Sequence, residues 1–165
     1  MVSQSRRKYS SATGRVSEVR FIRAAEQLGF QVTKGTRKDD IHLHVDYWVA
    51  HGDSKRWGVD VKGNNLPDEI WCEFKNVQGN PGWMYGGSSI IAFDLPEEGG
   101  FSIVKTKELR EYCELNVPEG VVDHKSKAYK RRYTRKDRAD VITSLKLSDL
   151  KSMLSYRVWK YFTGY

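Results

Sequence analysis

The segment RWGVDVKG (residues 56–63) largely determines how the centre of this chain is expected to fold. Residues two apart in a β-strand point to the same side, so Asp60 and Lys62 share one face and three apolar residues share the other. These apolar residues, which we expect to face a core, are Trp57, Val59 and Val61. The pattern has two interpretations. It is either an ion pair on a sheet surface, which stabilises little, or part of a site for phosphodiester cleavage.

A second alternating segment, IHLHVDYWVA (residues 41–50), precedes the first and predicts another strand. Asp46 lies on the polar face of this strand, fourteen residues before Asp60. If the two strands pair as a hairpin, their carboxylates converge, and the carbonyl oxygen of Val61 is a further oxygen ligand beside them.

Two more acids are candidates for the same place. Glu18 lies at the edge of the apolar face of a helix predicted over residues 15–30, and Glu73 lies in a strand, IWCEFKNV (residues 70–77), expected beside the other two. Several carboxylates on one sheet face repel each other unless something positive lies among them. Mg²⁺ prefers oxygen ligands and keeps several waters, so two or three carboxylates suffice to hold it. We expect Mn²⁺ to substitute.

A helix with Glu18, then a strand with Asp46, then a strand with Asp60-x-Lys62 is an order that resembles the PD-(D/E)XK nuclease superfamily. The resemblance covers roughly residues 15–105. The segments that carry the resemblance are SEVRFIRAAEQLGFQV, HVDYWV, WGVDVKG and IWCEFKNVQGNPGWMYGGSSIIAFD. The last is similar to phage-type members, some of which are free-standing homing endonucleases. The resemblance implies a restriction-endonuclease-like core, with Asp46 and Asp60 as metal ligands, Lys62 as the catalytic lysine and Glu18 as an auxiliary acid. Val45 stands before Asp46, where proline is common in the family.

A shifted register of the motif is the alternative. Glu73 and Lys75 form a second E-x-K, with Asp60 then serving as the first metal ligand. We prefer the first register, because Asp46 lies on a regularly alternating strand and the Asp60-x-Lys62 motif follows a short loop. Glu73 contributes in either register.

Positive charge is concentrated late in the chain. The net charge is +7, and residues 125–138 (KSKAYKRRYTRKDR) hold eight Lys or Arg against one Asp, which equals the excess of the whole chain. A basic block attracts a polyanion, usually nucleic acid, and interleaved tyrosines pack on sugars or bases. The alternative is a solvated face that only improves solubility. The expected DNA contacts are Lys75, Gln78, Lys125, Lys127, Lys130, Arg131, Arg132, Arg135, Lys136 and Arg138.

The 165 residues, 39% of them hydrophobic, fit a single domain with a real core. We expect an α/β (α+β) fold in which helices flank one central mixed β-sheet. Within a single nuclease domain (1–165), residues 1–14 form a flexible basic arm, 15–112 the catalytic core, and 113–165 the basic segment with a C-terminal helix that Ser148 caps. Shorter expected elements are strands at 30–33, 90–95 and 101–106, a loop at 34–40, a broken helix or structured loop at 78–89, and a helix at 107–116.

Several classes of protein are not supported by the sequence. There is no run of about 18 apolar residues and no apolar region typical of a secretory signal, so we expect a cytoplasmic protein, including a phage-encoded one in host cytoplasm, with no membrane partner. Cys72 and Cys113 lack a CxxC pattern and are expected to be reduced thiols without zinc. No GxxxxGK[ST] or GxGxxG motif supports an NTPase or a dinucleotide-binding protein.

The sequence therefore predicts a divalent-metal-dependent DNA endonuclease whose role is homing, junction resolution of the Holliday-junction-resolvase kind, or restriction. An RNA-processing nuclease would use the same site. A non-catalytic nucleic-acid-binding module that kept the fold is the alternative from another class. One active site per chain needs a homodimer, or two successive nicks, to break a duplex.

Overall fold

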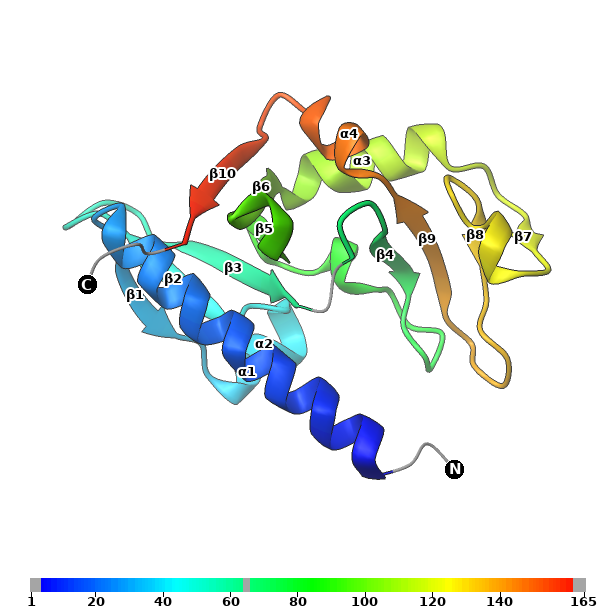
Figure 1. The fold of residues 1–165 in the computed structure, drawn as a ribbon, viewed down its shortest axis with the longest axis horizontal. Coiled ribbons are helices and arrows are strands. Elements are labelled where there is room, and N and C mark those ends of the chain that lie inside the picture. Colours follow the sequence, from blue (N-terminus) through cyan, green and yellow to red (C-terminus); the bar gives the residue numbers. More distant parts are fainter. Residues whose placement is uncertain (1–3, 64–65, 162–165) are drawn as a thin grey trace.

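The computed structural model describes residues 4–63 and 66–161, with side chains from residue 14 onward (Figure 1). Its helices are α1 (Gln4–Gln27), α2 (Arg37–Leu43), α3 (Thr106–Asn116) and α4 (Leu147–Lys151), and its 3-10 segments are η1 (Trp83–Tyr85), η2 (Pro96–Glu98) and η3 (Lys125–Lys127). Its strands are β1 (Gln31–Lys34), β2 (Tyr47–Ala50), β3 (Trp57–Lys62), β4 (Ile70–Lys75), β5 (Ile90–Leu95), β6 (Gly100–Lys105), β7 (Val121–Val122), β8 (Arg132–Tyr133), β9 (Val141–Leu145) and β10 (Arg157–Lys160).

The strands form two sheets. The first has the order β1-β2-β3-β5-β6-β10, and the second has the order β4-β9-β8-β7. In the first sheet β3 pairs with β5 in parallel, and the other pairs are antiparallel. The expected α+β class with a mixed sheet is confirmed. The expectation of one central sheet is wrong, because β4 does not pair with β3. It pairs with β9 in a second sheet.

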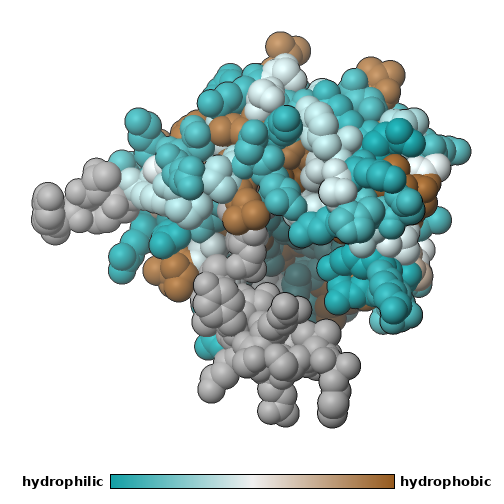
Figure 2. All heavy atoms as spheres, turned by 45° about the vertical axis from the view of Figure 1, so that its right-hand side comes forward, coloured by the Kyte–Doolittle hydropathy of each residue, from teal (hydrophilic) through white to brown (hydrophobic). Residues whose placement is uncertain are grey.

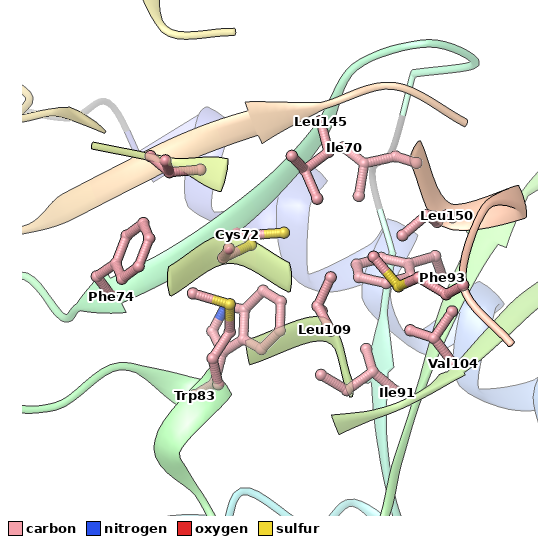
Figure 3. Packing of buried hydrophobic residues seen from close by; sticks show 14 of the residues in the cluster. Ile70, Cys72, Phe74, Trp83, Ile91, Phe93, Val104, Leu109, Leu145 and Leu150 are labelled. Carbon is pink, nitrogen blue, oxygen red and sulfur yellow. The ribbon is translucent and has the colours of Figure 1, made fainter. Parts of the chain in front are cut away.

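The first sheet lies between two layers (Figure 1). Helix α1 covers one face, and the buried side chains between them are Phe21, Ala24, Ala25, Tyr47, Val49, Val59, Ile90, Ala92, Phe101, Ile103 and Trp159. The second sheet, α3 and α4 cover the other face. Figure 3 shows part of this second core, where Cys72 and Phe74 from β4 meet Phe93 from β5 and Leu109 from α3.

The alternation in residues 41–50 predicted a longer strand than the structure has. Residues 37–43 form α2, and only Tyr47–Ala50 are extended. A capping box explains the helix: the Thr36 side chain accepts a hydrogen bond from the backbone N–H of Asp39, and the Asp39 carboxylate accepts one from that of Thr36. Residues 34–40 are therefore not simply a loop.

The C-terminal prediction is wrong. Helix α4 ends at Lys151, and residues 157–160 form β10, which pairs antiparallel with β6. Trp159 becomes part of the core under α1. The helix does not begin with a Ser148 cap, because the Asp149 carboxylate accepts the hydrogen bond from the backbone N–H of Lys146.

Three further differences concern smaller elements. Helix α1 already begins at Gln4, within the region expected as an arm, whose residues 1–3 lie outside the described part. Strand β9 was not predicted. Trp57, expected in the core with Val59, is 46% exposed at the start of β3.

Candidate active site

The backbone around Asp46 is held in place from both sides. The backbone N–H of Asp46 donates to the carbonyl of Val59 at 2.9 Å, and its carbonyl accepts from the N–H of Gly35 at 2.7 Å. A Cβ on Gly35 would lie 2.6 Å from the carbonyl oxygen of Val45, so the close approach requires glycine. Asp46 is thereby fixed directly before β2, beside β3.

The expected hairpin between the two strands is confirmed, since β2 and β3 pair antiparallel. The Asp46 Oδ2 atom accepts a hydrogen bond from the backbone N–H of Val61 at 2.8 Å. Asp60 is 3% exposed, and its Oδ1 atom lies 2.9 Å from the Lys62 Nζ atom. Val59 and Val61 pack on the opposite face, against the α1 side. The structure thus brings Asp46, Asp60 and Lys62 together.

The two carboxyl groups are difficult to ionise together. The pKa of Asp60 is raised to about 7, mainly by burial; the Lys62 amine opposes this shift and the Asp46 carboxylate adds to it. Burial also raises the pKa of Asp46, against the stabilising Val61 N–H and Lys62. One nearby lysine is therefore not enough to offset the desolvation of this pair.

Glu18 lies close to the pair but on α1. Burial raises the pKa of Glu18, and the Asp46 carboxylate is the next cause. Helix α1 lies close to the end of β3. A Cβ on Gly63, directly after β3, would lie only 2.9 Å from the Ser17 Oγ atom. Glu18 therefore neighbours Asp46 electrostatically, as an auxiliary acid would.

The donor set is compatible with a divalent cation. The buried Asp60 Oδ2 atom has no hydrogen-bond partner among the described residues. Two carboxylates and a backbone carbonyl such as that of Val61 are oxygen donors of the kind that Mg²⁺ accepts, with waters completing the coordination. In residues 4–63 and 66–161, no group of three or more His, Cys, Asp or Glu residues is arranged to hold a metal ion. A cation here would thus rely on waters.

Glu73 is not where the sequence pattern placed it. Strand β4 belongs to the second sheet and does not pair with β2 or β3, so that expectation is wrong, although Glu73 lines the same pocket as Lys62. The Glu73 Oε1 atom accepts a hydrogen bond from the backbone N–H of Trp83 at 3.3 Å. The β4–β9 register shifts between Glu73 and Lys75, and Lys75 is exposed. The direct contact of acid and lysine belongs to Asp60 and Lys62 and not to this second motif.

Acidic neighbours already engage much of the basic block. The ion pairs are Lys125 with Glu69 at 3.6 Å, Lys127 with Asp123 at 2.8 Å, Lys130 with Asp149 at 3.0 Å, and Arg135 with Asp140. The Arg132 guanidinium lies 4.1 Å from the ring centroid of Phe74. These side chains help to fold the segment against the second sheet, so they are not all equally available to a polyanion.

Other predicted contacts are open to solvent. Arg131, Lys136 and Arg138 are exposed, and none of the three forms an ion pair with another described residue. Lys75 and Gln78 are exposed near the start of the turn that follows β4. Figure 2, which turns the β7–β9 side forward, shows a mostly hydrophilic face with small separate hydrophobic patches.

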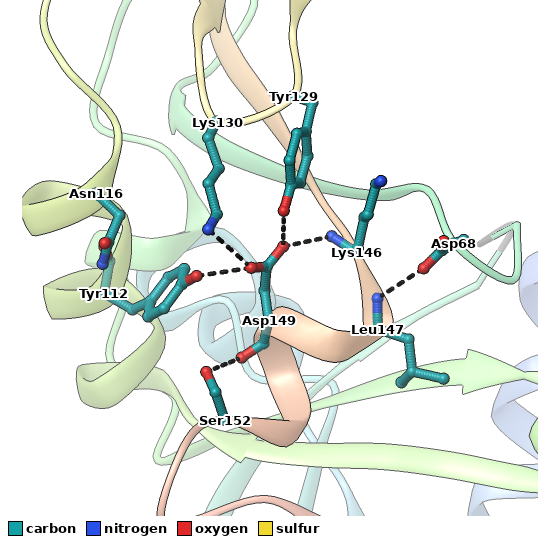
Figure 4. Close-up of polar contacts among 9 residues, drawn as sticks. All are labelled: Asp68, Tyr112, Asn116, Tyr129, Lys130, Lys146, Leu147, Asp149 and Ser152. Atoms are coloured by element: carbon teal, nitrogen blue, oxygen red, sulfur yellow. Dashed lines mark hydrogen bonds and ion pairs between the residues drawn. The ribbon is translucent and has the colours of Figure 1, made fainter.

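A buried carboxylate joins the basic block to α4 (Figure 4). Asp149, 6% exposed, accepts hydrogen bonds from the hydroxyls of Tyr112 and Tyr129 at 2.7 and 3.0 Å. It also accepts from the backbone N–H of Lys146 at 2.8 Å and pairs with Lys130. No pattern in the sequence pointed to Asp149, which directly follows Ser148.

The two cysteines are free and buried in the second core. The hydrogen bond that the Cys72 thiol donates to Cys113 is the main cause that raises the pKa of Cys72, followed by burial. The Cys72 thiol is therefore not a reactive thiolate.

No helix in the part of the chain that the structure describes has both the length and the apolar character needed to cross a bilayer.

Comparison of the chain with protein-family models, with curated proteins and with solved structures finds no match. The function therefore has to be argued from the site itself.

Proposed function

We propose that this chain is a Mg²⁺-dependent endodeoxyribonuclease of the PD-(D/E)XK kind. The observation that carries the proposal is the pairing of two adjacent carboxyl groups, the half-buried Asp46 and the buried Asp60, with Lys62 at 2.9 Å from the second. Buried like charges of this kind are costly unless a cation lies between them, and they concentrate at functional sites.

Each residue has a distinct role in this proposal. Asp46 and Asp60 would hold the cation, which would supply an activated water and offset the charge that develops on the scissile phosphate. Lys62 orients the attacking water and adds positive charge beside the phosphate. The backbone N–H of Val61 keeps the Asp46 carboxylate aimed at the site. Glu18 is an auxiliary acid that takes up a proton next to Asp46.

DNA is the proposed polymer because the basic block supplies cations on one side of the molecule. Arg131, Lys136 and Arg138 are the cations best placed to bind phosphates, since they are exposed and lack ion pairs within the described residues. Binding through phosphates weakens steeply as salt rises. Homing, junction resolution and restriction all use this chemistry, and the target structure distinguishes them.

Incubation of supercoiled plasmid with the protein in Mg²⁺, Mn²⁺ or EDTA tests the proposal. We expect nicking with either metal and none in EDTA, and loss of nicking in Asp60→Asn and Lys62→Met with DNA binding kept. Trp57→Leu is the matched control, since Trp57 lies on the same strand but away from the acids. Binding of plasmid, branched DNA and RNA without cleavage of any of them would instead identify a non-catalytic module.

A further inference from the structure

A pocket beside the candidate active site has a composition that the proposed chemistry does not by itself require. Its volume is about 510 Å³, within the range of small-molecule sites. It opens between β3 of the first sheet and β4, β8 and β9 of the second. Its aromatic and cationic lining residues are Lys62, Trp71, Trp83, Lys125, Tyr133 and Arg135.

Cations lie beside aromatic rings in this pocket, and the Glu73 carboxyl group lines it as well. The Lys62 Nζ atom lies 4.7 Å from the ring centroid of Trp83, and the Lys125 Nζ atom lies 5.5 Å from that of Trp71. Arg135 is held by Asp140, whose Oδ2 atom accepts from its Nε–H at 2.6 Å. Flat apolar faces beside fixed positive charges suit a ligand that is itself a flat ring joined to a phosphate.

Lys62 connects the pocket to the paired acids. Its amine contacts Asp60 at 2.9 Å and also lies over Trp83, so the same side chain belongs to both places. A strand whose phosphodiester lies at Lys62 would therefore place an adjacent nucleotide at the mouth of the pocket.

We propose that this pocket receives one unpaired nucleotide of the strand that is cut, its base against Trp71 and Tyr133 and its phosphate toward Lys125. The inference rests on the proposed function and names its substrate class: nucleic acid with a single-stranded or extrahelical nucleotide at the cleavage position. A base inside a duplex cannot reach such a pocket without leaving the stack. The cost of leaving is least for a base that is already unpaired.

Binding without metal tests the pocket independently of catalysis. Titration of the protein in EDTA with deoxynucleoside 5′-monophosphates, followed by tryptophan fluorescence, should show saturable quenching, and deoxyribose 5-phosphate should bind far more weakly. Trp71→Leu and Tyr133→Leu should each weaken nucleotide binding at least about fivefold, because stacking on one ring is lost. Trp57→Leu, on a strand end remote from the pocket, is the control. Equal affinity in all three variants, or no difference between nucleotide and sugar phosphate, would overturn the inference.

Cleavage then tests the substrate class. Two labelled duplexes of identical sequence, one with a single unpaired nucleotide, are cut in Mn²⁺, and the ratio of their rates is compared. We expect the unpaired position to be cut at least about tenfold faster, and this ratio to fall toward one in Trp71→Leu and not in Trp57→Leu. Equal rates for the two duplexes would overturn the substrate class. If no substrate is cut, the nuclease proposal fails, while the metal-free titration still decides whether the pocket binds nucleotides.

Discussion

Asp60 and Asp149 are both buried aspartates, 3% and 6% exposed, but their surroundings differ. The Asp149 carboxylate accepts hydrogen bonds from two tyrosine hydroxyls and a backbone N–H and forms an ion pair with a lysine. Its pKa lies below the ordinary value, because these interactions outweigh the opposing effect of burial. Asp60 has Lys62 on one oxygen and no hydrogen-bond partner among the described residues on the other, and burial raises its pKa to about 7.

In the proposed function, this difference distinguishes a structural carboxylate, Asp149, from a metal-binding one, Asp60. A fully hydrogen-bonded buried acid stabilises the fold, whereas an acid that burial leaves incompletely satisfied costs stability that only a ligand recovers. The comparison predicts that substitutions at the two places have opposite effects on stability and on activity.

The largest expected effect is on activity. Asp60→Asn should lower the rate of metal-dependent nicking at least about a hundredfold, because a metal ligand contributes several kcal/mol to the transition state and each 1.4 kcal/mol is tenfold. Asp149→Asn, assayed at a temperature where it stays folded, should keep the rate within about threefold. Nicking rates on plasmid measure both effects. A similar loss of nicking rate in the two variants would contradict the different roles of Asp60 and Asp149.

The next effect is on stability. Asp149→Ala should lower the free energy of unfolding by about 3 kcal/mol, because it leaves Lys130 without its acid and the part-buried hydroxyls of Tyr112 and Tyr129 without their acceptor. Tyr129→Phe removes one of these hydrogen bonds and should cost about 1 kcal/mol. Urea unfolding measures both, and a loss under 1 kcal/mol for Asp149→Ala would contradict a structural role.

The pH dependence of the metal-free protein should have opposite signs at the two places. Asp60 keeps its proton in the folded state up to about pH 7, whereas the unfolded chain releases it near 3.8. Its stabilising contribution is therefore complete below about pH 4 and is lost as pH rises to 7. Asp149, with a lowered pKa, contributes above pH 4 and loses its contribution in acid.

Asp60→Asn should accordingly be more stable than the parent protein at pH 8 in EDTA, by an amount on the order of a few kcal/mol, and about equal at pH 4. Asp149→Asn should be less stable than the parent at pH 8, with the gap narrowing toward pH 3. Urea unfolding at these pH values is the measurement. A less stable Asp60→Asn at pH 8 would show that its carboxylate is satisfied after all.

The smallest effect concerns the basic block. Each of Arg131→Gln, Lys136→Gln and Arg138→Gln should leave stability unchanged and lower the slope of log binding constant against log salt concentration by about 0.9, one phosphate contact each. Lys130→Gln should mainly lower stability, since its amine is bound to Asp149. DNA binding by fluorescence anisotropy at several salt concentrations distinguishes the two groups.

What the sequence predicted correctly depends on local pattern. The β2–β3 hairpin and the shared face of Asp60 and Lys62 follow from alternation over a few residues. Helix α2 also had a local signal, Thr36 with Asp39 three residues later, which the alternating histidines obscured.

The incorrect predictions concern elements whose structure depends on pairing with segments distant in the sequence. Strand β4 has the same alternation as β3, and nothing in it shows that β9, some seventy residues later, is its partner instead. The amphipathic C-terminal segment suits a helix, but pairing of β10 with β6 and burial of Trp159 under α1 favour a strand. The pocket between the two sheets escaped prediction for the same reason, since its walls come from both sheets.

The central claim is that Asp46 and Asp60 share a divalent cation, and anomalous scattering from crystals grown with MnCl₂ tests it most directly. The account predicts one strong anomalous peak between these two carboxylates, lost in crystals of Asp60→Asn. A peak at Glu73 without one at Asp60, or no peak at manganese concentrations that support nicking, would contradict it.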